Sequence, residues 1–265
     1  RDTILSIIRS HEGSSVTKSK SMVTEEIALN DHLEAAGLNV IEGDLGEYII
    51  QLAGETPFHI IAPAMHKSKE EVSELFFDKL RTPRLTEIEE MAAAARQALR
   101  QKFLDADMGV TGVNFAVAET GTVVIVTNEG NGRMTTSAPR VHVAISGMEK
   151  ILPAMEDLAL FLRLLPRSAT GQRITSYNTL VGGPRAASDE DGPEEFHLIL
   201  GDNGRLNLLK DEVLREALSC IRCGACLNHC PVYRKIGGHA YGWVYSGPIG
   251  AVVTPPMTGT KIARD

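Results

Sequence analysis

The first hundred residues alternate between strand-like and helix-like patterns of hydrophobic positions. Short apolar runs predict strands over Ser14–Thr17, Leu38–Ile41, Tyr48–Leu52 and Phe58–Ala62, the last ended by Pro63. Apolar residues at helical spacing predict helices over Thr24–Ala36, Ser68–Leu80 and Leu85–Phe103. Alternation of this kind indicates an α/β fold with an open, mostly parallel sheet flanked by helices.

Between Gly109 and Ser146 the pattern changes to short β-type runs joined by glycine-rich turns. Strands are predicted over Val113–Ala118, Thr122–Thr127 and Val141–Ile145. The unbroken apolar run at 123–126 indicates a strand covered on both faces. A helix opened by Pro153 is predicted to reach Leu165, followed by strands over Ser176–Val181 and Phe196–Leu200. This part of the chain is therefore expected to add a β-rich portion to the parallel sheet.

The chain leaves the sheet pattern after Gly201. A helix is predicted over Asp211–Leu218, and the glycine- and proline-rich stretch Gly237–Thr260 resembles a connector. We therefore predict two domains, over residues 1–205 and 206–265. Because the chain starts at Arg1 inside an amphipathic pattern and ends after this stretch, we interpret it as a fragment trimmed at both ends.

Composition narrows the functional classes. The chain has 265 residues and 43% hydrophobic content. Its formal net charge of −7 argues against nucleic acid as a main partner. No window approaches the roughly 18 to 20 apolar residues of a membrane span. The four cysteines lie in one group and leave none for disulfides, which favours a reducing, cytoplasmic location.

The cysteines form the strongest motif. Cys220, Cys223, Cys226 and Cys230, followed by Pro231, give C-x2-C-x2-C-x3-C-P, the run that holds iron–sulfur clusters in bacterial ferredoxin-type domains. Structural zinc is the rival, but zinc sites commonly use two cysteine pairs separated by a dozen or more residues. Either Cys230 completes one cluster within the chain, or each cluster needs cysteines from a second run outside it. We expect a [4Fe–4S] cluster, with one or none held by this chain alone.

Polar residues at predicted strand ends and turns form a second group. The candidate ligand-binding residues are Lys20, Asn114, Glu119, Arg133, Arg140 and Arg173. The four cations are suited to a carboxylate or phosphate. Glu119, on a Glu-Thr-Gly turn, is the candidate nucleophile or base, although a carboxylate that binds turn amides is the more common case. Turns need such residues for structural reasons, and Arg residues in loops are mostly solvated.

The glycine-rich segment after the cysteines carries Tyr241, Trp243 and Tyr245. These aromatic residues are interpreted either as a wall that shields a cluster from water or as an anchor on the main domain, and the anchor is slightly favoured. No Walker A, G-x-G-x-x-G or G-x-S-x-G pattern is present, so nucleotidase, Rossmann and hydrolase interpretations lack support.

Several longer segments resemble one family. They are KSKSMVTEE at 18–26, NFAVAETGT at 114–122, LPRSATGQRITSY at 165–177, CIRCGACLNHCPVYR at 220–234 and GGHAYGW at 237–243. Together they are similar to the LUD domain of lactate-utilisation proteins and, more narrowly, to the iron–sulfur subunits of the lactate utilization protein B family. The resemblance extends over essentially the whole chain, whereas family members are longer and carry a second cysteine run downstream.

The resemblance implies a fold like that of the NagB/RpiA/CoA-transferase group, with a ferredoxin-type iron–sulfur segment at the C-terminus. It implies an electron-transfer subunit of a cytoplasmic LutABC-like complex that oxidises L-lactate to pyruvate. Expected partners are a glycolate-oxidase-like iron–sulfur protein and a second LUD protein. Cys220, Cys223 and Cys226 would hold one cluster and Cys230 would serve the other, two clusters being usual in the full-length family.

Two other functions stay open at this point. The LUD domain is a candidate for ligand binding or CoA-transferase-like catalysis of its own, with Glu119 at its site, although analogy of fold is weak evidence of function. A redox sensor, in which loss of the cluster changes partner binding, is the other alternative.

Overall fold

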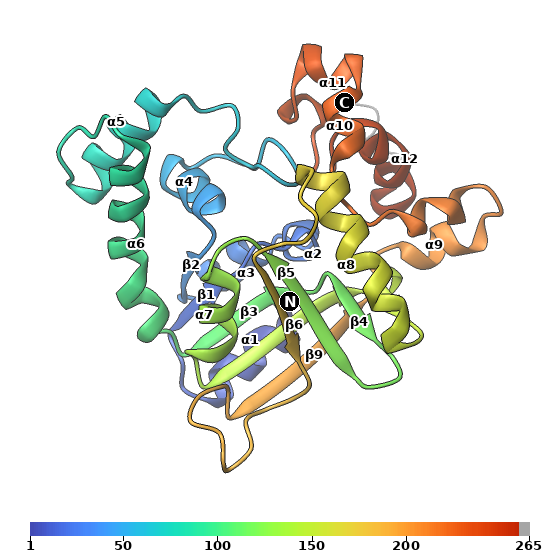
Figure 1. The fold of residues 1–265 in the computed structure, drawn as a ribbon, viewed down its shortest axis with the longest axis horizontal. Coiled ribbons are helices and arrows are strands. Elements are labelled where there is room, and N and C mark those ends of the chain that lie inside the picture. The colour runs from blue at the N-terminus through green and yellow to red at the C-terminus, as the bar shows by residue number, and fades with distance from the viewer. Residues whose placement is uncertain (260–265) are drawn as a thin grey trace.

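A five-stranded parallel sheet forms the centre of residues 1–259, the part of the chain that this computed structural model describes (Figure 1). Its strands are β1 (Ser15–Lys18), β2 (Asn39–Glu42), β3 (Met108–Gly112), β6 (Val141–Gly147) and β9 (Glu195–Gly201). They lie in the order β2-β1-β3-β6-β9, and every neighbouring pair is parallel. All five carboxyl ends therefore lie at one edge, and the strand order reverses between β1 and β3. The predicted mostly parallel sheet is confirmed.

The central strand β3 was not predicted as a strand, because glycine interrupts its apolar pattern. Gly109 is required there by close packing. A Cβ atom at this position would lie 1.9 Å from the carbonyl oxygen of Thr135, in the helix α7 (Asn131–Ser137) that covers the strand. α7 itself falls where the sequence suggested only a turn.

A smaller four-stranded sheet forms the predicted β-rich portion. It contains β4 (Phe115–Val117), β5 (Thr122–Thr127), β7 (Ile151–Leu152) and β8 (Tyr177–Val181), in the order β7-β4-β5-β8. β5 pairs antiparallel with both β4 and β8. Val123 and Val124 are fully buried in two different hydrophobic clusters. The prediction that this strand is covered on both faces is confirmed.

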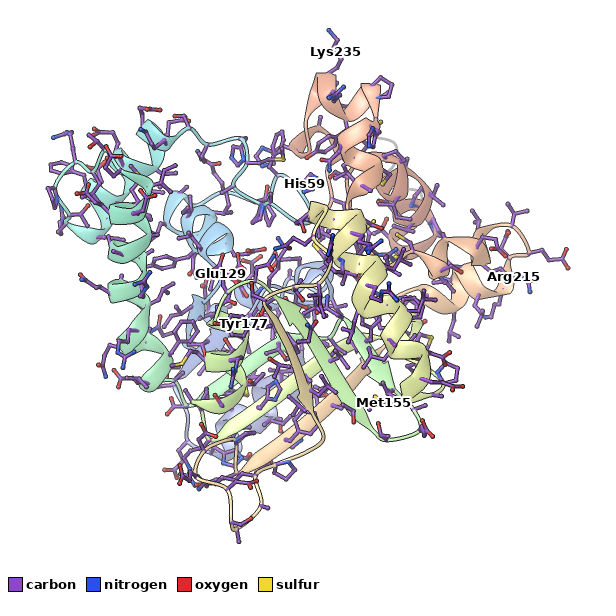
Figure 2. The ribbon with its side chains drawn as sticks, in the orientation of Figure 1. His59, Glu129, Met155, Tyr177, Arg215 and Lys235 are labelled. Atoms are coloured by element: carbon purple, nitrogen blue, oxygen red, sulfur yellow. The ribbon has the colours of Figure 1, made fainter. Side chains whose placement is uncertain are left out.

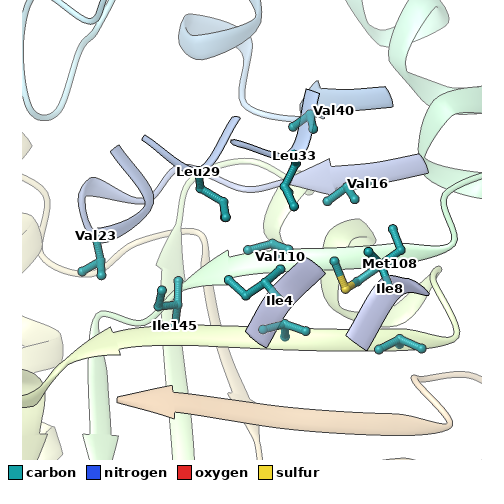
Figure 3. Packing of buried hydrophobic residues seen from close by; sticks show 12 residues of the cluster. Ile4, Ile8, Val16, Val23, Leu29, Leu33, Val40, Met108, Val110 and Ile145 are labelled. Atoms are coloured by element: carbon teal, nitrogen blue, oxygen red, sulfur yellow. The ribbon is translucent and has the colours of Figure 1, made fainter. Parts of the chain in front are cut away.

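The main core lies between the parallel sheet and its N-terminal helices (Figure 3). These helices are α1 (Asp2–Ser10), α2 (Met22–Glu26) and α3 (Leu29–Ala35). The expected single helix over 24–36 is wrong, because Ala28 has a left-handed φ of 45° that separates α2 from α3. The break lets Val23 and Leu29, six residues apart, both reach this core. Left-handed backbone costs a non-glycine residue about 1–2 kcal/mol.

Two expected strands between residues 45 and 62 are wrong. Residues 48–52 belong to helix α4 (Leu45–Ala53), whose residues Tyr48, Ile49 and Ile50 are all buried. A short helix buried on several sides gives a continuous apolar run that periodicity cannot distinguish from a strand. Residues 58–62 form an irregular loop, because Nδ1 of His59 accepts the N–H groups of Ile61 and Ala62 at 3.0 and 3.1 Å.

The other predicted helices are present with small changes at their ends. They are α5 (Lys69–Leu80), α6 (Ile88–Leu104) and α8 (Met155–Thr170). α5 begins at a capping box between Ser68 and Glu71. α8 continues through Pro166, beyond its expected end at Leu165, and its Leu158 packs against the smaller sheet.

The C-terminal segment, residues 205–259, is helical and folds back on the rest of the chain. It contains α9 (Arg205–Lys210), η2 (Leu214–Ser219), α10 (Ala225–His229), α11 (Pro231–Ile236), η3 (His239–Tyr241) and α12 (Gly247–Thr258). The helix expected over 211–218 is the 3-10 turn η2, and the expected connector is largely helix. The domain division at residue 205 stays a prediction. Within residues 1–259, no helix has both the length and the apolar character needed to cross a bilayer.

Candidate functional site: a cysteine loop beside a charged cavity

The four cysteines lie on a loop whose backbone turns sharply twice. η2 leads into Cys220, and left-handed φ values of 60° at Arg222 and 75° at Gly224 redirect the chain on either side of Cys223. Besides this left-handed backbone, close packing also favours glycine at position 224, because a Cβ atom there would lie 3.0 Å from the Ile61 side chain. Cys226 lies in α10. The loop is therefore wrapped tightly against the loop at 58–62.

The surroundings of the thiols fit an iron–sulfur cluster. All four cysteines are free, and the Sγ of Cys230 accepts the N–H of Tyr233 at 3.4 Å. Cys226 is exposed and the other three cysteines are half-buried. Partial burial of the Cys226 thiol, followed by the neighbouring Cys220 and Cys223, raises its pKa. Hydrogen bonds to sulfur and exclusion of water are the features by which a protein tunes such a cluster.

The sequence spacing of the cysteines suits a cluster better than a single zinc ion. Among residues 1–259, no three His, Cys, Asp or Glu side chains, the four cysteines included, are grouped around one point. Tetrahedral zinc needs four donors around one point, whereas the thiolates of a cubane bind separate irons. The donor set and its spacing therefore favour the cluster.

Aromatic residues after the cysteines anchor the loop on the main domain. Tyr245 is 1% exposed and donates to the Glu26 carboxylate. Tyr233 donates to the Phe58 carbonyl at 3.0 Å. Gly238 lies so close that a Cβ atom there would be 1.6 Å from the same carbonyl oxygen. The anchor interpretation is confirmed for Tyr245.

A buried ion network joins the C-terminal segment to the parallel sheet. The Arg205 guanidinium, 0% exposed, donates to Glu26 at 2.8 and 2.9 Å and also to Glu149. Glu26 lies at the end of α2, and Glu149 follows β6. Nearby carboxylates raise the pKa of Arg205 despite its burial. The network fixes the position of the segment relative to the carboxyl ends of the strands.

A cavity of about 490 Å³ lies between this edge of the sheet and the cysteine loop. Residues just beyond the ends of β1, β2, β3 and β6 line it, namely Ser19 and Lys20, Asp44, Val113 and Asn114, and Glu149 and Lys150. Ile221 and Arg222 of the cysteine loop close another side. The cavity thus occupies the place where open parallel sheets bind ligands, at the point where strand order reverses.

Asp44 lines one end of the cavity, and its carboxyl group is hydrogen-bonded to that of Glu47. Asp44 caps α4, accepts the Gly46 N–H at 3.1 Å and the Asn131 side chain at 3.0 Å. Burial raises the pKa of Glu47, and the Asp44 carboxylate raises it further. Although burial alone would raise the pKa of Asp44, its bond with Glu47 and the ammonium of Lys20 lower it overall. The pKa values of the two carboxyl groups are therefore shifted in opposite directions, upward for Glu47 and downward for Asp44.

The other end carries cations beside the cysteine loop. The Arg222 guanidinium is 3.6 Å from the Glu149 carboxylate and 4.8 Å from the centre of the Tyr245 ring. Lys150 donates to the Ile221 carbonyl at 3.4 Å. Burial, followed by the charge of Arg222, lowers the pKa of Lys150 to about 8. Glu129 lines the cavity, and Figure 2 shows Arg215 extending away from it.

The structure brings only two of the six sequence-predicted ligand residues to this cavity. Lys20 lines it, with its Nζ 2.9 Å from Glu47 and 2.8 Å from the Ile61 carbonyl, and Asn114 lines it from the end of β3. The other four lie elsewhere. Their roles in ligand binding stay predictions that this arrangement does not support.

Each of those four has another environment. Glu119 is exposed and accepts the Met155 N–H at 2.8 Å, so it caps the first turn of α8. Arg140 is 77% exposed and pairs with Glu194 at 2.8 Å. Arg133 lies over the Tyr177 ring at 5.8 Å, and Arg173 is exposed. The four cations expected to act together are thus not gathered.

Sequence reasoning missed Asp44, Glu47, Lys150 and Arg222. Asp44 and Lys150 both follow predicted strands, which was the available signal. Glu47 was hidden by the mistaken strand at 48–52. Arg222 was noted only as part of the cysteine run, because nothing local shows that it is 7% exposed.

Family comparisons agree with this two-part site. Residues 1–200 match the family model described as LUD domain, and residues 216–261 match the one described as 4Fe-4S dicluster domain. The cysteine loop and its anchoring residues lie in the second match. The cavity lies between the two.

Curated relatives are similar over nearly the whole chain. Lactate utilization protein B of Bacillus subtilis (strain 168) is 51% identical over 257 residues, which is 97% of this chain and 53% of that protein. The same-named protein of Bacillus licheniformis is 50% identical over 97% of this chain and 54% of its own length. The uncharacterized electron transport protein YkgF of Escherichia coli (strain K12) is 50% identical over 99% of this chain and 55% of its own. The chain spans about half the length of these relatives.

One solved structure is also similar. It is a DUF162 family protein from Deinococcus radiodurans, matched over 73% of this chain and 90% of its own, with 15% identity and a TM-score of 0.33. The likeness is too weak to bear on fold or function.

Proposed function

The chain belongs to the LUD-domain family, and from this membership and its cysteine loop we propose that it is an iron–sulfur electron-transfer protein of lactate utilisation. The observation that carries the proposal is the cysteine loop itself. Four free thiols lie on one loop within the residues that match a 4Fe-4S dicluster domain. The names of the relatives support lactate utilisation and electron transport as the setting.

The proposed ligand assignment follows the spacing. Cys220, Cys223 and Cys226 hold one cluster, and Cys230, which precedes Pro231, serves the other. When bound, a [4Fe–4S] cluster supplies one-electron transfer. The remaining ligands of each cluster are proposed to come from a second cysteine run, as the resemblance to the family implies.

The residues around the loop have roles that suit this function. Ile221 and Cys223 pack against the hydrophobic core of the smaller sheet, which keeps water from that side of the loop. The Tyr233 N–H donates to the Cys230 sulfur, and Arg222 places a buried positive charge between Cys220 and Cys223. Positive charge and N–H donors both stabilise thiolate ligands and their added electrons.

In the proposed complex, L-lactate is oxidised to pyruvate with release of two electrons and two protons, and this chain belongs to the electron-carrying part. Its proposed partners are a glycolate-oxidase-like iron–sulfur protein and a second LUD protein, and its proposed location is the cytoplasm. The exposed apolar side chains Val213, Val232 and Ile236 near the cysteine loop are suited to such contacts.

The test is L-lactate-dependent reduction of an artificial one-electron acceptor by the full-length protein with its partners. We expect Cys223→Ser to lower the rate at least tenfold and Glu119→Gln to leave it within twofold. Unchanged activity in the cysteine variant would contradict the proposal. Loss of activity in the glutamate variant would instead favour LUD-domain catalysis at Glu119.

A further inference from the structure

The cavity beside the cysteine loop has the size and position of a small-molecule site. Its volume of about 490 Å³ lies within the roughly 300–1,000 Å³ typical of ligand pockets. Apolar side chains such as Ile49, Ile125 and Leu165 form much of its wall. Four parallel strands each contribute residues from just beyond their carboxyl ends, so its shape is set by the central sheet.

The two ends of the cavity differ in their charged side chains: carboxylates accompanied by the Lys20 ammonium lie at one end, and two cations accompanied by the Glu149 carboxylate lie at the other. Asp44 and Glu129 belong to one end, where partial burial and the Asp44 carboxylate both raise the pKa of Glu129. The other end contains Lys150 and Arg222, which interact with each other and with Glu149. A ligand with an anionic head and hydroxyl groups elsewhere would match this separation, because carboxylates accept hydrogen bonds from hydroxyls.

The cationic end has unused hydrogen-bonding capacity. The Arg222 side chain is 7% exposed, and none of its guanidinium nitrogens has a hydrogen-bond partner within 3.5 Å in the described chain. Its nearest carboxylate atom is Oε1 of Glu149, at the longer distance of 3.6 Å, and Cys220 and Tyr245 lie beside it. A buried polar group without a close partner is unfavourable, and a ligand that supplies the partner removes that cost. A planar guanidinium with free donors is suited to binding a carboxylate or phosphate through two parallel bonds.

We propose that this cavity binds a small hydroxylated organic anion, with its carboxylate or phosphate at Arg222 and Lys150 and its hydroxyl groups toward Asp44. Binding at this site does not require a cluster, so the proposal goes beyond the electron-transfer function. Because Arg222 and Ile221 lie between Cys220 and Cys223, an occupied cavity contacts the cysteine loop directly.

The test is isothermal titration calorimetry of the full-length protein with four probes. L-Lactate and gluconate present a carboxylate with one or several hydroxyls, whereas glycerol 3-phosphate and inorganic phosphate present a phosphate with or without them. Two variants alter the cavity by different means. Arg222→Gln removes the cationic head site, and Ala169→Leu fills space from the α8 wall without changing charge. Arg215→Gln, on an exposed arginine outside the cavity, is the control.

We expect at least one hydroxylated probe to bind, and both cavity variants to weaken it at least tenfold while the control stays within twofold. The head group of the probe that binds distinguishes a carboxylate from a phosphate ligand. Binding by none of the four, or binding that persists in both cavity variants, would overturn the proposal. Iron content is measured on the same samples, so that a protein that binds the probe but holds no iron counts against the electron-transfer function only.

Discussion

The buried ion network at Arg205 is expected to determine whether the cysteine loop stays attached to the sheet. Arg205→Ala removes three charge-assisted bonds and leaves the Glu26 and Glu149 carboxylates, 0% and 2% exposed, without their main partner. Removing one member of a buried ion pair costs about 3–5 kcal/mol. Glu26 keeps donors from Tyr245 and Asn203. We therefore expect a loss near the lower limit, about 3 kcal/mol of unfolding free energy.

Urea unfolding measures this loss through two signals. Far-UV circular dichroism follows the whole chain, and the fluorescence of Trp243, the single tryptophan, follows the C-terminal segment. Arg84→Ala is the matched control, since its pair with Glu74 is 60% and 55% exposed and should contribute far less to stability than the Arg205 network. Arg205→Lys keeps the positive charge but lacks the planar guanidinium that donates several hydrogen bonds. Its loss of unfolding free energy should lie between those of Arg205→Ala and Arg84→Ala. A loss below about 1 kcal/mol in Arg205→Ala would refute the reasoning.

Three further predictions concern other parts of the structure. Gly238→Ala should lower stability by about 1–3 kcal/mol through its clash with the Phe58 carbonyl, whereas Gly182→Ala, with open space around it, should stay within about 0.5 kcal/mol in the same urea assay. Burial lowers the pKa of His142 to about 4, and the ordinary value is about 6.5. The unfolded chain therefore binds more protons between these values, and stability should fall by up to about 3 kcal/mol as pH drops from 7 to 4. Urea titrations at several pH values should show a smaller decline for His142→Gln, and equal declines would exclude His142 as the cause. Glu119→Ala should cost about 1 kcal/mol as the loss of a helix cap and leave iron content unchanged, which urea unfolding and metal analysis check.

Much of the architecture could be predicted from local pattern. Alternating strands and helices indicated the parallel sheet, and the helical spacing over 68–80 placed the start of α5 within one residue. The pattern failed where tertiary packing decides conformation. Gly109 looks like an interruption, yet it permits α7 to cross β3 at close range. Ala28 carries no local sign of the left-handed backbone that separates α2 from α3.

The candidate site likewise has one part that could be predicted from the sequence and one part that could not. The cysteine loop was predictable because its chemistry requires cysteines at short, fixed spacing. The cavity was not, because its residues come from four strand ends and a loop more than 170 residues away from the first of them. Lys20 and Asn114 were found from their place beside strands. Arg222 needed the fold, since only packing shows that its guanidinium is buried and without a hydrogen-bond partner in the described chain.

The most direct test of the account is the iron and acid-labile sulfide content of the full-length protein, purified without oxygen, compared between wild type and Cys223→Ser. We expect equal amounts of iron and sulfide, about four of each per cluster, with an EPR signal of a reduced cubane. We expect Cys223→Ser to lose the iron and sulfide of one cluster, while its circular dichroism spectrum stays that of the wild type. Zinc in place of iron, or a serine variant with full iron and sulfide, would contradict the central claim that this loop holds a cluster.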